Sequence, residues 1–388
     1  SVANADLDLF STIESDAWSD KSFDVIVSNP PYLNLKHNNK KNSKAIEAFR
    51  SMSINNLATQ IRSSNAFPIS TTGMINLYRV SIEKILQMAG RGSTIGIICP
   101  SSLFADKSAL PLRKEILTKN QLMYVRFFEE SDSLFEGVTQ ATTIFIARTS
   151  GVTSKFEISR SGKTFNIDLD DIKSTYPTSL EVPQINKMGW SILQKLSKFK
   201  KVQELNFIRN KRGELDLTLD KKFITSAKNE YPLIKGVMLK ETIDRSEAYY
   251  VDIDAFLEKK SDDYKKNDFG NSRLVCNQIS NMNTKRRLRF LKSDKLDIIA
   301  NSCNYLSFDK GVPINFYANQ LNSSLHNWFF KITSTNNHIN NYEIDNLPVL
   351  DHTKLSSKKI HAVSSINDEE IMRFFDLTEK EIQYILSN

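Results

Sequence analysis

The chain has 388 residues, which at about 150 residues per domain predicts two or three domains. Hydrophobic residues make up 40% of it and charged residues 25%, a globular balance that excludes a disordered or fibrous protein. Lysine and arginine number 52 against 45 acidic residues, and this net charge of +7 favours a polyanionic partner. Glycines number only 12, so the chain has little material for phosphate-binding glycine loops.

Membrane and metal sites are not predicted. Apolar runs are far shorter than the roughly 18–20 residues that a bilayer span needs, and the first residues lack a signal-peptide pattern. Cys99, Cys276 and Cys303 are scattered and odd in number, which argues against a disulfide framework or a zinc site. The five histidines form no metal-binding HExxH pair. We expect a protein of a reducing, cytoplasmic compartment.

The first 150 residues alternate strand and helix signals. Apolar, β-branched runs predict strands at 23–28, 93–99, 122–128 and 141–147, and apolar periodicity predicts helices at 76–89 and 110–118. Gly90 stands where a helix-ending glycine belongs. The alternation predicts a mostly parallel α/β sheet whose last two strands pair antiparallel.

The rhythm changes after about residue 150. Proline and small polar residues cluster at 174–183 and predict a boundary, after which a helix at 190–199 and an irregular α+β region follow. Two short amphipathic helices are expected within 366–388. The predicted domains are residues 1–173, 174–350 and a helical tail at 351–388.

The strongest local signal is the tetrapeptide Asn29-Pro30-Pro31-Tyr32, directly after the first strand. Two prolines stiffen the backbone and hold the residue before each of them extended. The Asn29 side chain and the Pro30 carbonyl therefore aim two oxygens at one point beyond the carboxyl end of the strand, where ligands of α/β sheets bind. With the flat ring of Tyr32 beside them, these groups predict a site for a planar amine.

The segment Phe23-Asp24-Val25-Ile26-Val27-Ser28 with this tetrapeptide resembles motif IV of S-adenosylmethionine-dependent amino-methyltransferases, in which Asn-Pro-Pro-aromatic grips the target nitrogen. Residues 5–10 (ADLDLF) resemble motif III, which implies cofactor binding by Asp6 and Leu7, with Asp8 as the rival of Asp6. Residues 76–78, 90–104 and 134–148 resemble the following motifs of the gamma-class (TaqI-like) adenine-N6 DNA methyltransferases.

The second half resembles the target-recognition domains of restriction–modification enzymes. The similarity lies in residues 231–236 (YPLIKG), 321–330, 342–349 and 377–382. The resemblance implies a partial Rossmann-like methyltransferase sheet followed by an α+β target-recognition domain, in a Type II or IIG system of a bacterium. It also implies S-adenosylmethionine as cofactor and double-stranded DNA as partner.

The family's glycine-rich cofactor motif should precede motif III. The only close glycine trio, Gly90, Gly92 and Gly96, lies downstream of the tetrapeptide. We therefore expect an N-terminally truncated enzyme, with a separate N-terminal fragment or a cognate restriction endonuclease as a further partner. No convincing nuclease motif is present in the sequence.

Basic residues gather in the second half, as expected of a domain that neutralises phosphates. Four of them, with Lys292 beside them, are our candidate DNA contacts: Lys285, Arg286, Arg287 and Arg289. A second cluster comprises Lys198, Lys200, Lys201, Arg209, Lys211 and Arg212. A run of charge can equally be a solvated face.

The resemblance implies that the amine of a flipped-out adenine donates hydrogen bonds to the side chain of Asn29 and to the carbonyl of Pro30, while Tyr32 stacks on the base. Phe165 is the candidate for the opposite face of the base, with Phe156 as its rival. Two alternatives stay open: a catalytically incompetent DNA-specificity fragment, and a methyltransferase that acts on RNA or on a protein glutamine.

Overall fold

The computed structural model describes residues 23–35, 44–128, 141–160, 162–334 and 337–387. The chain divides into two compact units, residues 1–187 and 188–388. The boundary expected at 173/174 falls inside the helix α5 (Leu169–Thr175) of the first unit, and the tail from residue 351 belongs to the second unit.

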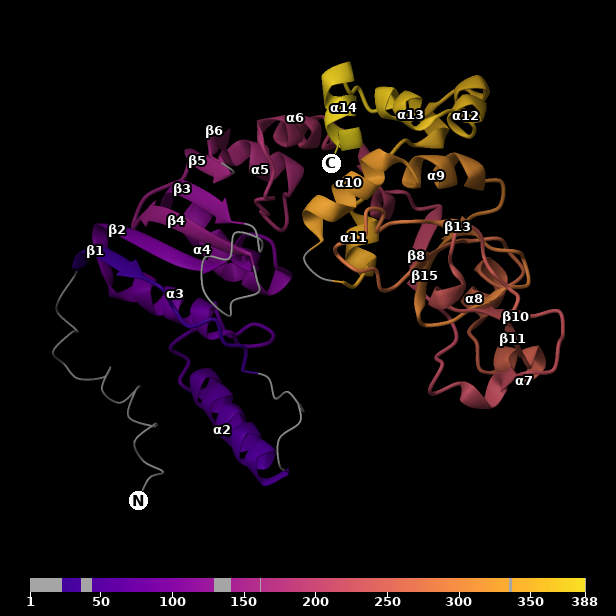
Figure 1. Cartoon of the computed structure of the whole chain (residues 1–388), viewed down its shortest axis with the longest axis horizontal. Helices are drawn as coiled ribbons and strands as arrows, with labels where there is room; N and C mark the ends of the chain where they lie inside the picture. Colours follow the sequence, from indigo (N-terminus) through magenta and orange to yellow (C-terminus); the bar gives the residue numbers. More distant parts are fainter. Residues whose placement is uncertain (1–22, 36–43, 129–140, 161, 335–336, 388) are drawn as a thin grey trace. The chain divides into compact units, whose positions relative to one another are not determined.

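The first unit is built on a six-stranded sheet of order β1-β2-β4-β3-β5-β6 (Figure 1). Its strands are β1 (Phe23–Ser28), β2 (Ala89–Pro100), β3 (Gln121–Phe128), β4 (Thr142–Arg148), β5 (Lys155–Arg160) and β6 (Lys163–Asp168). β1 and β2 are parallel, as are β3 and β5, whereas β4 pairs antiparallel with both its neighbours and β6 with β5. The expected antiparallel closure by β3 and β4 is confirmed, but the sheet is mixed rather than mostly parallel.

Helices position the strand ends. The helices are α2 (Lys44–Ser63), α3 (Leu77–Met88) and α4 (Leu110–Thr118), with α5 following the last strand. α3 packs on β2 and α4 on β3, on one face of the sheet (Figure 1). Fully buried side chains from strand and helix, including Ile95, Leu112 and Phe145, fill the space between them. Burying each such side chain contributes about 1.5–3 kcal/mol before the entropy cost of ordering the chain is subtracted.

Two local expectations in this unit need correction. Gly90 directly follows Ala89, the C-cap of α3, as predicted, but it lies in β2 and does not adopt the positive φ of a helix-ending glycine. Residues 174–183 are no free linker, because Tyr176, Leu180 and Val182 are buried in the first unit. The amide of Val182 also donates to the carbonyl of Phe104 at 2.9 Å. The helix α2 and the hairpin of β5 and β6 were not predicted.

The second unit contains two four-stranded sheets, of orders β14-β10-β11-β9 and β13-β12-β15-β8, and a two-stranded pair β16-β7. The bounds are β7 (Lys200–Lys201), β8 (Ile208–Arg212), β9 (Ile224–Thr225), β10 (Pro232–Ile234), β11 (Tyr249–Val251), β12 (Leu274–Asn277), β13 (Leu291–Lys292), β14 (Ile298–Ile299), β15 (Cys303–Phe308) and β16 (Pro348–Val349). Its irregular α+β character agrees with the sequence. The strands are short, so most of its order depends on packing rather than on long ladders.

Helices complete the second unit: α6 (Lys187–Leu196), α7 (Ile253–Glu258), α8 (Asp262–Asn267), α9 (Ile314–Leu321), α10 (Ser324–Thr333), α11 (Asn341–Asp345), α12 (Ser357–Val363), α13 (Asp368–Phe374) and α14 (Glu379–Ser387). The last two are the expected pair of C-terminal helices. The carboxylate of Glu381 on α14 accepts from Ser191 at 2.8 Å and from Lys195 at 2.6 Å on α6. The C-terminal helices are therefore fastened to the start of the same unit. In the part of the chain that the structure describes, no helix is long and apolar enough to cross a bilayer.

Candidate functional site

The tetrapeptide Asn29–Tyr32 leaves the sheet at the carboxyl end of β1, as the sequence predicts. Asn29 and Pro31 are exposed, Pro30 is buried and Tyr32 is half-buried. β1 lies beside β2 in parallel register, with Ser28 opposite Ile97. The paired part of β1 therefore ends one residue before the tetrapeptide, and exposed Asn29 is accessible to a ligand while Pro30 is buried.

The far end of this loop is fastened to the start of α3. Asn34 forms an isolated antiparallel bridge with Asn76, and the side-chain amide of Asn76 donates to Oδ1 of Asn34 at 2.8 Å. Oδ1 of Asn76 also accepts from the amide of Tyr78 at 3.2 Å, so the same side chain caps the helix. The amide of Leu35 donates to the carbonyl of Ile75 at 2.9 Å. The loop is thus held at both ends.

Apolar packing reinforces this attachment. Leu35 is buried in a cluster with Ala58 and Ile61 of α2 and with Ile75 and Val80 at the start of α3. The unpredicted helix α2 therefore has a role in the site, because it covers the point where the loop joins α3.

Tyr32 follows the end of β1 and lies close enough to Cys99 on β2 for the two side chains to interact electrostatically. Its hydroxyl is buried and has no hydrogen-bond partner among the described residues. Burial, with a smaller contribution from Cys99, raises the pKa of Tyr32 to about 12. Nearby, the hydroxyl of Tyr78 lies 3.3 Å from that of Ser102. Both tyrosines are therefore neutral at physiological pH. Tyr32 is suited to stacking through its aromatic ring and not to proton transfer through its hydroxyl.

β1 forms one edge of the described sheet, and its outer face is apolar. The side chains of Val25 and Val27 are 63% and 81% exposed. Such exposure is unusual for a strand of a parallel pair, because strands of this kind are normally covered on both faces.

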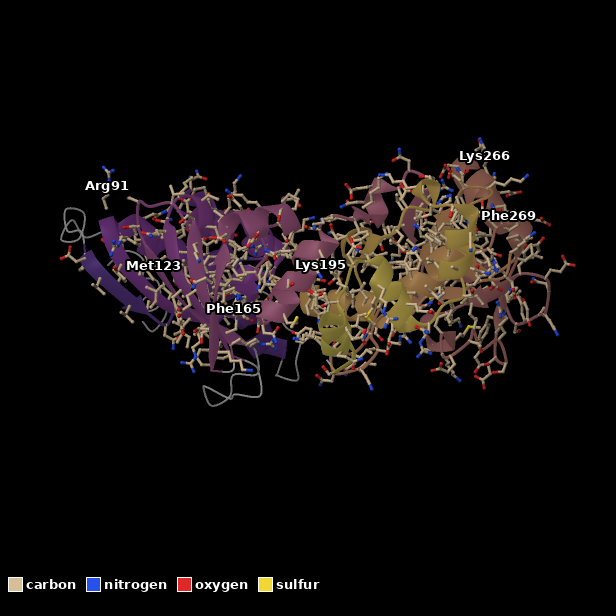
Figure 2. All side chains as sticks on the ribbon, turned by 90° about the horizontal axis from the view of Figure 1, so that it is seen from above. Arg91, Met123, Phe165, Lys195, Lys266 and Phe269 are labelled. Carbon is tan, nitrogen blue, oxygen red and sulfur yellow. The ribbon has the colours of Figure 1, made fainter. Side chains whose placement is uncertain are left out.

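The structure does not bring Phe165 to Tyr32. Phe165, labelled in Figure 2, lies on β6, at the opposite edge of the six-stranded sheet from β1. Five strand spacings separate the two strands, which corresponds to about 24 Å at roughly 4.8 Å per spacing. Phe156 on β5 is 2% exposed and belongs to the core. The expectation that either ring closes the other face of a base held by Tyr32 is not supported by this topology.

The expected cofactor residues Asp6 and Leu7, and the rival Asp8, lie outside the described residues, as does the loop part of the motif at 134–140. Of the glycine trio, all three members lie in β2 and none forms a turn before a helix. Among the described residues, no three histidine, cysteine, aspartate or glutamate side chains are grouped so as to hold a metal ion.

The predicted DNA contacts separate into two pairs. Lys285 and Arg286 are exposed. Arg287 is only 4% exposed, and its guanidinium lies 4.9 Å from the ring centre of Phe330, so it supports the interior of the unit instead of contacting DNA. Arg289 is half-buried and pairs with Glu241 at 2.8 Å. The expectation of a DNA contact is therefore corrected for Arg287 and weakened for Arg289.

Three members of the second basic cluster pair with acidic residues of their own unit. Lys200 pairs with Asp351 at 3.0 Å and Arg209 with Asp309 at 2.6 Å. Lys211 reaches the fully buried carboxylate of Asp268 at 2.8 Å. Removing one partner of a buried ion pair leaves an uncompensated buried charge, so the ammonium of Lys211 stabilises the fold.

The segment Tyr231–Gly236 supports the core of the second unit. Leu233 and Ile234 on β10 are fully buried. A Cβ at Gly236 would lie 2.8 Å from Oδ1 of Asn277, and the Gly236 amide donates to Oγ of Ser302 at 3.0 Å. The glycine is required by this close approach. Lys235 extends over the ring of Tyr249, 4.1 Å from its centre.

The fold and the strand-end loop first define a general class of protein: an α/β domain with an Asn-Pro-Pro-Tyr tetrapeptide at the end of a strand, followed in the chain by an α+β unit. Residues 4–135, about a third of the chain, match the family model described as Eco57I restriction-modification methylase. This match includes β1, the tetrapeptide, α3 and β2. A search of curated proteins found no match.

Solved structures with similarity to the chain include the type IIG restriction endonuclease BpuSI, at 10% identity and a TM-score of 0.39. The Type IIL restriction-modification enzyme MmeI in complex with DNA has 11% identity and a TM-score of 0.47. Each match covers 93% of this chain and 52% of the other chain. A nuclease-deletion mutant of the Type ISP restriction-modification enzyme LlaGI, with a DNA substrate mimic, has 14% identity and a TM-score of 0.44, with 92% and 35% coverage. The chain thus spans about half the length of BpuSI and MmeI.

Proposed function

We propose that the chain is part of a site-specific DNA methyltransferase of a restriction–modification system, acting in the bacterial cytoplasm on N6 of an adenine that is flipped out of the duplex. The observation that carries the proposal is the arrangement of Asn29–Tyr32 at one strand end: an exposed asparagine, a buried proline and a neutral tyrosine ring. The match of residues 4–135 to a restriction-modification methylase model supports the same class.

The described side chains would act on the amine and the ring of the base. Oδ1 of Asn29 and the carbonyl of Pro30 would each accept one hydrogen of the exocyclic amine. Holding both hydrogens favours a tetrahedral nitrogen whose lone pair is withdrawn from the ring and is free to react, so that positioning and electrostatics supply most of the rate. Tyr32, which stays protonated, would stack on the base.

S-adenosylmethionine, when bound, supplies the methyl group. The described residues fit the acceptor half of the reaction, since Asn29 and Pro30 offer two oxygens and no charge. Asp6 and Leu7 are our proposal for the cofactor contacts. Asn29 and Pro30 cannot serve as general bases, and the amine would release its surplus proton to water.

The open edge of β1 suggests the partner that completes this site. Val25 and Val27 present an apolar face beside the tetrapeptide. We propose that a polypeptide carrying the glycine-rich cofactor motif packs on this face, whether as a separate N-terminal fragment or as a further part of one protein, because strands of a parallel pair are normally covered on both faces.

The decisive experiment replaces Asn29 with alanine in the full-length protein. Transfer of labelled methyl to DNA, with nucleosides identified by mass spectrometry, should fall at least about 100-fold, as on loss of one preorganised polar contact to the reacting group. Affinity for DNA should change little. Asn166→Ala is the control, since Asn166 is exposed on the far edge strand β6. Retained activity in Asn29→Ala, or product on RNA or on protein glutamine, would contradict the proposal.

A catalytically incompetent DNA-specificity protein is the second candidate. It is favoured by the placement of Gly90, Gly92 and Gly96 within β2, where they form no cofactor loop. Equilibrium dialysis with labelled S-adenosylmethionine separates the two: sequence-selective DNA binding without cofactor binding by the full-length protein would favour this candidate.

A further inference from the structure

The second unit carries a short polar loop that is exposed along its whole length. Its six residues, called here the 281–286 loop, are Asn281, Met282, Asn283, Thr284, Lys285 and Arg286, and all are exposed. The loop has two positive charges and no acidic residue. It projects between Ser280 and the buried residues Arg287 and Leu288.

The beginning of the loop is fixed by one asparagine of a different segment. Oδ1 of Asn337 accepts from the amide of Met282 at 2.9 Å, and its carbonyl accepts from the amide of Ser280 at 2.8 Å. Within the loop, Oδ1 of Asn281 accepts from the amide of Asn283 at 2.9 Å. The turn is therefore defined before any partner arrives.

The end of the loop is fixed by Asn327 on α10 and by Asn322, the residue that follows α9. Oδ1 of Asn327 accepts from the amides of Arg287 at 2.8 Å and Leu288 at 3.2 Å, while its nitrogen donates to the carbonyl of Lys285 at 3.0 Å. The guanidinium of Arg286 donates to the carbonyl of Asn322. Two asparagines on other elements, Asn327 and Asn337, thus bind the loop backbone at both ends.

This bracing is notable for a loop that buries no apolar side chain of its own. Fixing a residue's backbone costs about 1–2 kcal/mol of conformational entropy, and an exposed polar loop recovers little of that by burial. The hydrogen bonds from the side chains of Asn327 and Asn337, which lie outside the loop, restrain its exposed backbone. A rigid tip lowers the entropy cost of binding a partner.

The chemistry of the tip matches base edges. The side chains of Asn283 and Lys285 make no hydrogen bond or ion pair to any residue that the structure describes, whereas Arg286 is held against its own unit. An asparagine amide pairs with N6 and N7 of adenine, a lysine ammonium with O6 and N7 of guanine, and an apolar side chain such as that of Met282 contacts the thymine methyl. The major groove, about 12 Å wide, admits an element of this size.

We propose that the 281–286 loop enters the major groove of duplex DNA and determines part of the recognition sequence, with Asn283 and Lys285 contacting base edges. This rests on the proposed function, since it requires DNA as the substrate. Arg286 and Arg287 position the loop: the first binds the carbonyl of Asn322 and the second packs over Phe330.

The test is selection of binding sites from randomised duplexes by the full-length protein and its variants Asn283→Ala and Lys285→Ala. Each variant should lose preference at one or two base-pair positions by about 5- to 150-fold. Affinity for random duplex should change by less than about 10-fold. Melting temperatures should match the wild type, because both side chains are exposed.

Lys266→Ala is the matched control, since it removes the same charge from an exposed lysine on α8 (Figure 2). It should leave the selected sequence unchanged. Unaltered preferences in both loop variants, or an equal loss in Lys266→Ala, would overturn the role of the loop while leaving the methyltransferase proposal intact. Failure of the wild type to select any duplex would overturn both proposals.

Discussion

Replacing Tyr32 with phenylalanine and with alanine separates what its hydroxyl does from what its ring does. The hydroxyl is buried and has no hydrogen-bond partner among the described residues, while the residue as a whole is half-buried at the strand end. The phenylalanine variant removes the oxygen alone. The alanine variant removes the ring as well.

The two variants should differ first in stability. An unpaired buried polar group costs roughly 1–3 kcal/mol, so Tyr32→Phe should leave the free energy of unfolding unchanged or raise it by up to about 1 kcal/mol. Truncating a fully buried aromatic costs about 3–5 kcal/mol, and for the half-buried ring of Tyr32 we expect about 1–2 kcal/mol in the alanine variant. Urea unfolding of both variants measures these differences.

They should differ more in binding an extrahelical base. Stacking on an aromatic side chain contributes about 1–3 kcal/mol per base, so Tyr32→Ala should weaken binding of a flipped base by about 5- to 150-fold. Tyr32→Phe keeps the ring and should remain within about threefold of the wild type. Fluorescence of 2-aminopurine at the target position reports the flipped base directly, at a temperature where both variants are folded.

A phenylalanine variant as defective as the alanine variant would refute this reasoning, because the hydroxyl would then be the functional group. Phe104→Ala is not a usable control, since Phe104 is fully buried and truncating its ring would destabilise the fold by about 3–5 kcal/mol. Asn166→Ala is the control, because Asn166 is exposed on β6 and its replacement should change neither stability nor base binding.

Two further predictions concern the second unit. Burial lowers the pKa of His326 from 6.5 to about 4, so the folded state prefers the neutral ring; its stabilising contribution is complete above pH 6.5 and is lost as the pH falls toward 4. Unfolding free energies measured between pH 7 and pH 4 should fall by about 3 kcal/mol more in the wild type than in His326→Gln, and parallel curves would contradict this origin. A Cβ at Gly213 would lie 1.9 Å from the carbonyl oxygen of Ala300, so Gly213→Ala should cost about 2–4 kcal/mol. In Gly96→Ala, by contrast, the nearest atom is 4.0 Å away, and equal melting temperatures of the two variants would refute the close-contact argument.

Predictions that rest on neighbouring residues agree best with the structure. The strand Phe23–Ser28 and the tetrapeptide after it combine β-branched residues with two prolines, and both signals act within a few residues. The bounds of α4, Leu110–Thr118, also match the prediction, because Pro111 marks its first turn.

Predictions that require knowledge of distant partners fare worse. The basic residues around Lys211 in the sequence suggest a phosphate contact. In the structure its ammonium instead binds the carboxylate of Asp268, 57 residues further along the chain. Arg287 is one of four closely spaced cations, and only the position of Phe330 on α10 shows that it points inward. A spacing along the sequence likewise cannot reveal that β6, and with it Phe165, ends at the far edge of the sheet.

The distribution of charge follows from these pairings. The excess of basic over acidic residues is a property of the whole chain, but some of its cations pair with buried carboxylates, as Lys211 does with Asp268 and Lys200 with Asp351. Replacing such a cation removes an ion pair of the fold, so any weaker DNA binding would arise through loss of structure. A cation in an exposed, braced loop, such as Lys285, can instead be replaced with the fold intact. We therefore propose exposure together with backbone bracing, rather than the density of basic residues in the sequence, as the criterion for choosing residues of this unit to test for DNA contact.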